Sequence, residues 1–231
     1  MKKNLVSIIF LLLFSTNFST NSFSHPQHYQ EINHLEYELY RNNNLIGSHK
    51  YDFDRNDNKL TVKSVVNFKI SKLGINLYNY FAESEEIYEK NKFFSFNSKT
   101  IQNKKNKYVN ISVKTNENKL LIDGSSFKGD TNIDCVVGTW WNHEIVKAKA
   151  QISAISGRVI HQKVVFLGKK KIEINGKQYD ALHFKFLSSD ETLTDNKKLN
   201  TDIWYDAETL IWLKAQFVKQ GKWEYRLKKL N

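Results

Sequence analysis

The chain has 231 residues, 40% of them hydrophobic, and a formal net charge of +11. Its only cysteine, Cys135, excludes an intrachain disulfide, so stability must come from burial of side chains. All but four of its 35 basic residues are lysines, which lack the bidentate fork suited to specific phosphate recognition. We expect mainly solvated surface charge, and a basic patch that attracts an anionic membrane surface is the alternative.

The first 24 residues have the layout of a secretory signal peptide. Lys2 and Lys3 give a positive start, Leu5–Phe14 is an apolar run, and small polar residues follow up to Ser24. The run is about half the length that a membrane span requires, and no cysteine follows it as a site for lipid attachment. We predict a signal peptide over residues 1–24 and a flexible segment over 25–33. The mature protein is expected to be periplasmic, soluble and not a lipoprotein, so nucleic acid is not an expected partner.

Residues 34–124 alternate between apolar and polar side chains, which is typical of antiparallel strands. Turn residues such as Asn42–Asn44 and Asn56–Asn58 interrupt the alternation, and Gly47 is a candidate bulge. Short turns cannot hold crossover helices, so a meander of hairpins is expected. The expected strands cover residues 34–41, 45–54, 59–70, 76–88, 92–101, 108–113 and 119–122.

The segment Gly138–Gly157 departs from this alternation and is the best candidate for a helix. Trp141 and Ile145 begin an apolar series at helical spacing, Thr139 is a candidate N-cap, and Gly157 is a candidate terminator. We therefore expect one amphipathic helix over Thr139–Ser156, laid across the sheet.

Strand patterns return after this segment. The expected strands cover residues 159–167, 171–174, 179–187, 202–205, 210–219 and 222–227. Asn175-Gly176 is a strong signal for a tight turn, and the polar stretch 188–200 is expected to be a loop. No linker interrupts the chain, so residues 34–231 are predicted to form a single β-rich domain.

No strong catalytic or metal-binding motif is present, and we predict no catalytic residue, no metal and no cofactor. His25 and His28 are interpreted as part of a flexible tail, with weak metal binding as the alternative. Cys135 lies in an apolar stretch and is interpreted as a packed side chain, not a reactive thiol.

Carboxylates leave one enzymatic alternative open, a hydrolase that acts on envelope glycans or lipids. This alternative requires two carboxylates, or a carboxylate and a histidine, to converge in a cleft. Glu83 or Asp202 beside His183 or His161 would favour it. The other carboxylates considered are Glu85, Glu86 and Asp206.

Aromatic residues make up 13% of the chain, and most of them are expected to fill the core. A curved sheet with one helix leaves part of this apolar surface free to line a cavity for a lipid-like ligand. The residues predicted to line the cavity are Tyr78, Phe81, Phe94, Phe96, Trp140 and Trp141.

Several short motifs resemble a family of uncharacterised exported domains of Gram-negative bacteria. They are G-T-W-W at Gly138–Trp141, I-N-G-K at Ile174–Lys177, A-L-H-F at Ala181–Phe184 and I-W-Y-D at Ile203–Asp206, with a looser match over Tyr37–Gly47. The resemblance implies a mainly β fold, in which a long antiparallel meander curves into an open half-barrel with a helix on its concave side. That shape is similar to periplasmic lipoprotein carriers, which bind acyl chains.

Together these features predict an exported periplasmic protein that binds a hydrophobic or amphipathic ligand. A structural or interaction protein of the envelope, with no small ligand, is the alternative. A hydrolase is the third reading.

Overall fold

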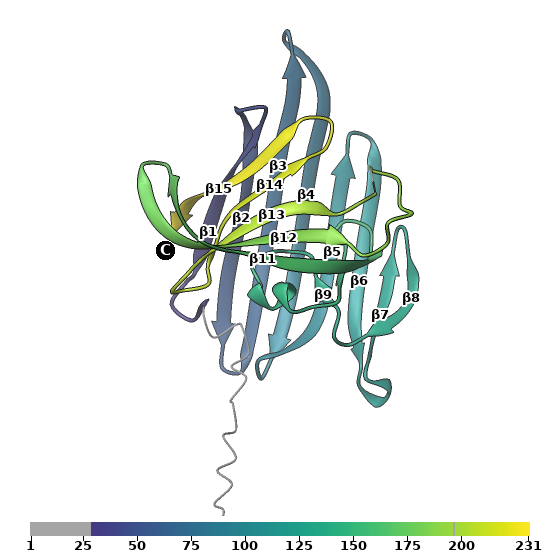
Figure 1. The fold of residues 1–231 in the computed structure, drawn as a ribbon. Coiled ribbons are helices and arrows are strands. Elements are labelled where there is room, and N and C mark those ends of the chain that lie inside the picture. The colour runs from purple at the N-terminus through teal and green to yellow at the C-terminus, as the bar shows by residue number, and fades with distance from the viewer. Residues whose placement is uncertain (1–28, 196) are drawn as a thin grey trace, which may run out of the picture.

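The computed structural model describes residues 29–195 and 197–231, which form one sheet of 15 strands (Figure 1). The expected signal peptide and residues 25–28 lie outside the described residues. The strands are β1 (His34–Arg41), β2 (Asn44–Asn56), β3 (Lys59–Lys72), β4 (Ile75–Glu89), β5 (Lys92–Gln102), β6 (Lys105–Lys114), β7 (Lys119–Gly124), β8 (Lys128–Asn132), β9 (Val136–Val137), β10 (Ala150–Ile152), β11 (Val159–Ile174), β12 (Lys177–Ser188), β13 (Asn200–Asp206), β14 (Trp212–Val218) and β15 (Lys222–Leu230).

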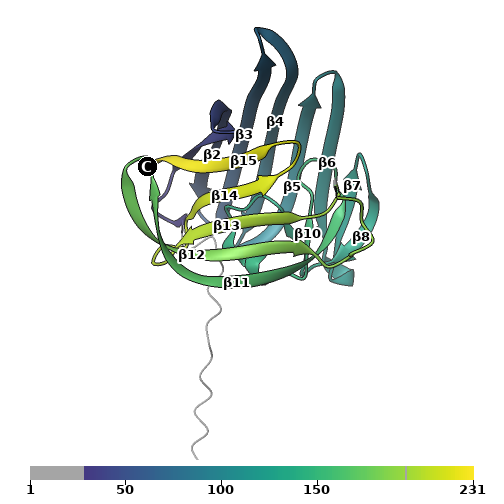
Figure 2. The ribbon, with the colours of Figure 1, turned by 45° about the horizontal axis from the view of Figure 1, so that its top comes forward.

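The strands follow a meander that is folded back on itself. Spatial order runs from β8 down to β1, then β15 down to β9, so the first and last strands pair in the middle of the sheet. All pairs are antiparallel except β9 with β10. The sheet curls until the second half crosses in front of the first (Figure 2). Because β8 and β9 do not pair, the sheet stays open, and the expected mainly β, antiparallel architecture is confirmed.

Turn residues explain why the hairpins form where they do. The first residue of each two-residue turn has a positive φ, which asparagine and aspartate tolerate better than most residues. The expected turn at Asn175-Gly176 joins β11 to β12, with φ values of 51° and 79°. Gly47 lies at the expected bulge of β2, where a Cβ atom would lie 2.1 Å from the carbonyl oxygen of Asn67.

The expected helix over Thr139–Ser156 is wrong. The chain there forms one turn of 3-10 helix, η3 (His143–Val146), and then the strand β10. The apolar spacing reflects burial of an irregular segment, since Trp141, Ile145 and Ile152 are all fully buried. Side chains of the sheet donate hydrogen bonds to several carbonyls of this segment, which therefore need no helical amide partner. Tertiary contacts override the local pattern.

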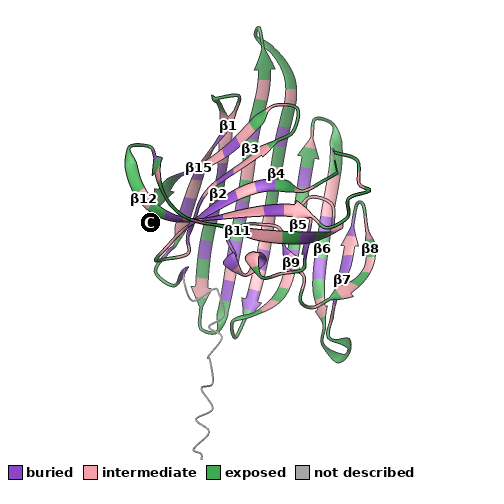
Figure 3. Cartoon of the chain, viewed as in Figure 1, coloured by how far each residue is buried: buried purple, intermediate pink, exposed green. Residues whose placement is uncertain are grey.

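The core lies between the two halves of the sheet, and buried positions alternate with exposed ones along the strands (Figure 3). Tyr37 of β1 stacks on Trp212 of β14 with ring centroids 4.0 Å apart, and its hydroxyl donates to the Trp212 carbonyl. Two smaller apolar clusters flank this one. One lies around Phe96, Ile122 and Ile152, and the other lies around Leu39, Phe68 and Tyr80.

Residues 29–33, expected to belong to a flexible segment, instead pack against the domain. Tyr29 is fully buried and stacks on Phe53 at 5.4 Å, and Arg55 of β2 donates to the carbonyl of Ile32 at 2.9 Å. Burial of the Tyr29 ring and the hydrogen bond to Ile32 offset part of the entropy that the backbone loses when it is ordered. Residues 29–33 therefore belong to the folded domain.

Candidate functional site

The segment Gly138–Lys149, called the plug below, crosses the concave face between the two halves of the sheet. Three tyrosine hydroxyls donate to the successive carbonyls of residues 139–141 at 2.5, 2.9 and 2.7 Å. The donors are Tyr51 of β2, Tyr205 of β13 and Tyr29. Gln162 of β11 donates to two carbonyls further along the plug. The plug is thus held by side chains of both halves.

Trp140 has an unusual backbone conformation at the start of the plug. Its φ of 60° lies in the left-handed region, which bulky side chains avoid. Its ring meets Trp212 and Tyr225 edge to face, with centroids 5.4 and 5.6 Å away. Strained residues of this kind persist where the surroundings hold them, and they cluster at ligand sites. Trp140 is therefore the first marker of a candidate site.

Glu86 of β4 lies beneath the plug and ties it to the sheet. Its carboxylate accepts hydrogen bonds from the Tyr88 hydroxyl at 2.5 Å, from Trp141 Nε1 at 3.0 Å and from Thr139 Oγ1 at 3.3 Å. Burial raises the pKa of Glu86 to about 7, although these three hydrogen bonds oppose the rise. Two side chains of the plug therefore contact a carboxyl group that titrates near neutral pH.

A cavity of about 230 Å³ lies beside the plug, on the concave side of β2–β5 and against β14–β15. Its walls are aromatic, aliphatic and polar. The aromatic walls are Tyr51, Tyr80, Trp140, Phe217 and Tyr225, and the aliphatic ones include Val66, Ala82 and Ile155. The polar lining includes His49, Ser64, Ser98 and Thr100. This mixture suits an amphipathic molecule.

His49 and Ser64 form a hydrogen-bonded pair in the cavity wall, with 2.8 Å between Nε2 and Oγ. A serine beside a histidine is the arrangement of a nucleophile and its base. However, burial lowers the pKa of His49 to about 3, and among residues 29–195 and 197–231 its buried Nδ1 atom has no hydrogen-bond partner to orient the ring. A base this weak does not activate a serine at neutral pH. The pair therefore supports polar recognition better than hydrolysis.

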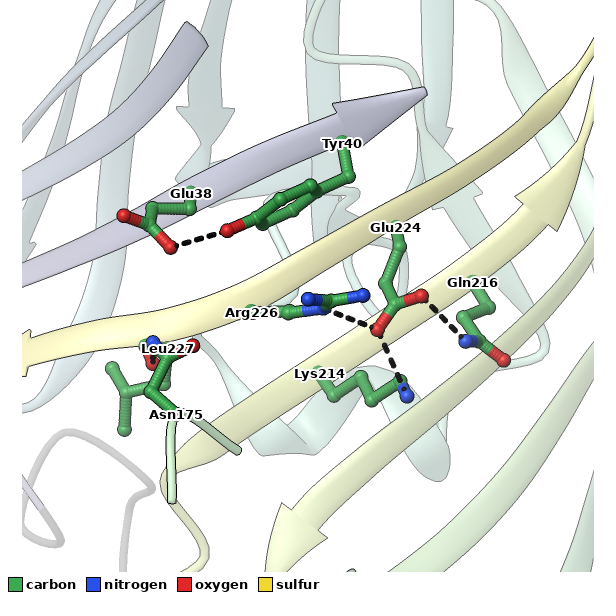
Figure 4. Close-up of polar contacts among 8 residues, drawn as sticks. All are labelled: Glu38, Tyr40, Asn175, Lys214, Gln216, Glu224, Arg226 and Leu227. Atoms are coloured by element: carbon green, nitrogen blue, oxygen red, sulfur yellow. Dashed lines mark hydrogen bonds and ion pairs between the residues drawn. The ribbon is translucent and has the colours of Figure 1, made fainter. Parts of the chain in front are cut away.

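The outer face of β12–β15 and β1 carries a network of charges. Glu224 accepts hydrogen bonds from Arg226 at 2.6 Å and Gln216 at 2.9 Å, and Lys214 lies 3.0 Å from the same carboxylate (Figure 4). Burial acts to raise the pKa of Glu224, but these three partners outweigh it and lower the pKa to about 2. The network stabilises the outer surface where the first and last strands meet.

His183 and Asp202, named above as a candidate acid–base pair, do meet. His183 Nε2 lies 2.8 Å from Asp202 Oδ1, Lys185 donates to the other carboxylate oxygen at 2.6 Å, and the imidazole stacks on Trp204. None of these side chains lines any of the four cavities described in the molecule. These four cavities therefore give no support at this pair to the hydrolase alternative, which requires a cleft. His161 is exposed on β11.

The six aromatic residues predicted to line a cavity fall in different places. Trp140 lines the cavity, and Tyr78 packs against Phe68 in the small cluster that also contains Tyr80, a residue of the cavity wall. Trp141 and Phe96 are fully buried in the core. Phe81 and Phe94 are exposed by 37% and 49% and alternate with inward-facing neighbours, so they lie on the outer face. The structure thus brings two of the six to or near the cavity.

Other cavity residues were missed by sequence reasoning. Tyr80 and Tyr225 line the cavity, and so do the paired His49 and Ser64. Alternation along β4 does separate Tyr80 from Phe81, but it does not say which face is concave. The pairing of His49 with Ser64 follows from the register of β2 on β3 and has no signature in the sequence.

Cys135 is half-buried, and its thiol lies 3.3 Å from Thr131 Oγ1. Burial raises its pKa, although Thr131 opposes the rise, so the thiol is a poor nucleophile. Over residues 29–195 and 197–231 no group of three or more His, Cys, Asp or Glu side chains is placed to hold a metal ion. In the same part of the chain, no helix has the length and apolar character needed to span a bilayer.

Fold and site together define an open, β-barrel-like protein whose concave face is occupied by its own plug. A crystal structure of similar shape is that of a β-barrel-like protein of the domain of unknown function DUF1849 from Brucella abortus. The two share 11% identity with a TM-score of 0.57, over 87% of this chain and 97% of that one. At this identity the likeness shows the fold alone.

The chain belongs to the family described as domain of unknown function DUF6134, whose model matches residues 37–228. This match confirms the resemblance to an uncharacterised β-rich family that the short motifs indicated. None of the curated proteins matches the chain.

Proposed function

We propose that this protein is exported and binds a small amphipathic molecule, or one acyl-chain segment of a larger lipid, in the cavity beside the plug. The observation that carries the proposal is Trp140. Trp140 forms part of the cavity wall, and its backbone has a φ of 60° between two anchored carbonyls, that of Thr139 bound by Tyr51 of β2 and its own bound by Tyr205 of β13. Strain at a cavity wall is a feature of ligand sites.

The size of the cavity limits the ligand. At about 230 Å³ it falls below the range of roughly 300–1,000 Å³ typical of sites for drug-sized ligands. A whole phospholipid does not fit, whereas a short alkyl chain does, and each buried methylene contributes about 0.8 kcal/mol. The polar group of such a ligand has His49, Ser64 and Ser98 as hydrogen-bonding partners in the same wall.

Export rests on the sequence of the leader. The basic start, the apolar run Leu5–Phe14 and the small residues up to Ser24 support removal of the leader on secretion. Amino-terminal sequencing of the mature protein tests this, with a start near His25 expected. An intact Met1 in the fractionated protein would contradict export.

The alternative of an envelope interaction protein receives less support from the sheet edges. The edge strand β9 has two residues, and the other edge strand, β8, carries Lys128 and Asp130. Short and charged edges oppose pairing with a strand of another chain. A partner that pairs with an edge strand would also leave the cavity on the concave face without a role, so we favour the acyl-chain proposal.

Titration calorimetry with octanoic acid as the probe tests the cavity directly, because one short alkyl chain matches its volume. We expect saturable binding of one probe per protein, with a negative heat-capacity change on burial of the alkyl chain. Trp140→Ala removes part of the wall, and Ala82→Leu fills the space. Both variants should weaken binding at least fivefold.

Phe81→Ala is the matched control, because it removes an aromatic ring from the outer face of the same strand that carries Tyr80 and Ala82. It should leave probe binding unchanged. Thermal unfolding of every variant separates loss of the site from loss of the fold. Equal binding by the wild type, Ala82→Leu and Phe81→Ala in folded protein would place the probe elsewhere and overturn the proposal.

A further inference from the structure

The hairpin of β3 and β4 extends beyond its neighbours in the sheet. Pairing of β2 with β3 ends at Gly47 and Phe68, and pairing of β4 with β5 begins at Tyr80 and Gln102. Among the described strands, none therefore flanks the two-stranded ribbon of residues 69–79 on either side. Figures 1 and 2 show this ribbon rising above the other hairpins at the same end of the sheet.

The tip of this ribbon is apolar, although solvent surrounds it (Figure 3). Leu73 is 92% exposed, Ile75 65% and Leu77 55%. Leu73 occupies the first position of the turn, with a φ of 51° that asparagine tolerates better. In the five other two-residue turns of the described strands this position is polar, and the residues are Asn42, Asp57, Lys90, Asn103 and Asn175. Leu73 is thus the one apolar residue at this position among the two-residue turns of the described strands.

The hairpin turns around the ribbon lie at the same rim of the sheet and are basic. Asn103 in the β5–β6 turn pairs with Asn79, and Asn42 in the β1–β2 turn pairs with Lys222 of β15. Residues 41–48, 68–81 and 100–107 of these turns hold six lysines and arginines and no aspartate or glutamate. The β14–β15 turn adds Lys219 and Lys222, but it lies beside the loop 189–199, which carries Asp190, Glu191 and Asp195. Exposed apolar residues accompany them, namely Leu45, Ile101 and Val218.

The opposite ends of the strands have mixed charge. The turns there include Asp57, Glu89 and Glu117 among their lysines. The net positive charge is therefore not spread evenly, and one rim combines positive charge with a protruding apolar tip. Protruding apolar side chains with flanking lysines are the combination by which peripheral proteins bind anionic bilayers.

We propose that the rim formed by the β3–β4 tip and the neighbouring turns docks the protein on an anionic lipid bilayer, with Leu73 and Ile75 inserted at the headgroup level. A protein partner fits this surface less well, because a narrow ribbon offers little flat area for an interface. A negatively charged bilayer complements the β1–β2, β3–β4 and β5–β6 turns, which carry lysines and arginine without aspartate or glutamate. This docking does not depend on whether the cavity holds an amphiphile.

Co-sedimentation of the mature protein with vesicles tests the proposal. One vesicle set is phosphatidylcholine alone, and the other contains 30% phosphatidylglycerol. We expect binding to the anionic vesicles that weakens as salt is raised, and little binding to the neutral ones. Lys69→Gln with Lys72→Gln should weaken binding about 25-fold, at about fivefold per lysine. Leu73→Asn with Ile75→Asn should weaken it at least fivefold.

Matched controls come from the opposite end of the strands. Lys90→Gln with Lys92→Gln removes the same charge from the β4–β5 turn, and Leu121→Asn removes an exposed leucine of β7. Both control proteins should bind as the wild type does. If the charge control weakens binding as much as Lys69→Gln with Lys72→Gln, the attraction is unspecific and the proposed rim is wrong.

A fluorescent label reports insertion. With Cys135 replaced by serine, an environment-sensitive nitrobenzoxadiazole label on L73C should shift to the blue on anionic vesicles, while the same label on K90C should not. No shift at position 73 in vesicle-bound protein would overturn the insertion of the tip. Failure of the wild type to bind vesicles of either composition would overturn the whole proposal and leave the cavity proposal untouched.

Discussion

Glu86 offers the sharpest test of how the plug is held. Replacing it with glutamine keeps its shape but removes its charge and its titration. The pKa of the carboxyl group rises from 4.5 to about 7 on folding, so the folded protein holds this proton more tightly than the unfolded chain. The stability that this group contributes is complete below pH 4.5 and is lost as pH rises through 7.

The magnitude follows from the size of the shift. One pKa unit corresponds to about 1.4 kcal/mol, so ionisation of Glu86 lowers the free energy of unfolding by about 3 kcal/mol at pH 8. Glu86 is 2% exposed, and solvent screening does not reduce this value. We expect the stability of Glu86→Gln relative to wild type to increase by about 2 to 3 kcal/mol between pH 5 and pH 8.

Urea unfolding followed by tryptophan fluorescence at each pH measures this difference. Glu83→Gln, on the exposed face of the same strand, is the control and should follow the wild type. Comparison at each pH is needed because His49 titrates in the opposite sense. A stability difference between Glu86→Gln and wild type that does not change with pH would refute the buried-carboxylate reasoning.

Three further predictions concern the stability of the fold around the plug and the cavity. Burial lowers the pKa of His49 from 6.5 to about 3, so the free energy of unfolding of the wild type should fall as the pH falls from 6.5 to 3, by up to about 1.4 kcal/mol per pH unit. Urea unfolding of His49→Gln should show a smaller fall over the same pH range. Trp141→Ala should cost about 3–5 kcal/mol, since it empties a fully buried site; a loss below 1 kcal/mol would mean that the plug is not packed. Gly47→Ala should cost about 1–3 kcal/mol, because its Cβ meets the backbone of β3; an unchanged melting temperature would contradict that contact.

Most strand positions could be predicted from local pattern. Alternation and asparagine turns locate β1 to β7 within about three residues. The sequence pattern predicts β11 as two separate strands. The register shift between Phe166 and Lys169, where Gly168 has a φ of 99°, interrupts the alternation of this strand. Pairing of β1 with β15 is a contact between the chain ends, and no local signal encodes it.

The site was harder to predict, for two physical reasons. The spacing of Trp141 and Ile145 predicts which residues are buried, and an irregular segment bound by tyrosine hydroxyls buries them as well as a helix does. Strand parity separates Tyr80 from Phe81 but cannot identify the concave face until the sheet has curled. The polar pair of His49 and Ser64 depends on strand register as well.

The central claim is that the cavity holds an amphipathic molecule in the cell. Native mass spectrometry, with solvent extraction, of mature protein purified gently from its envelope fraction tests this most directly. We expect a bound amphiphile at one per protein in the wild type and in Phe81→Ala, and its loss in Ala82→Leu. A folded wild-type protein that carries no such molecule, and takes up none when lipids and fatty acids are added, would contradict the claim.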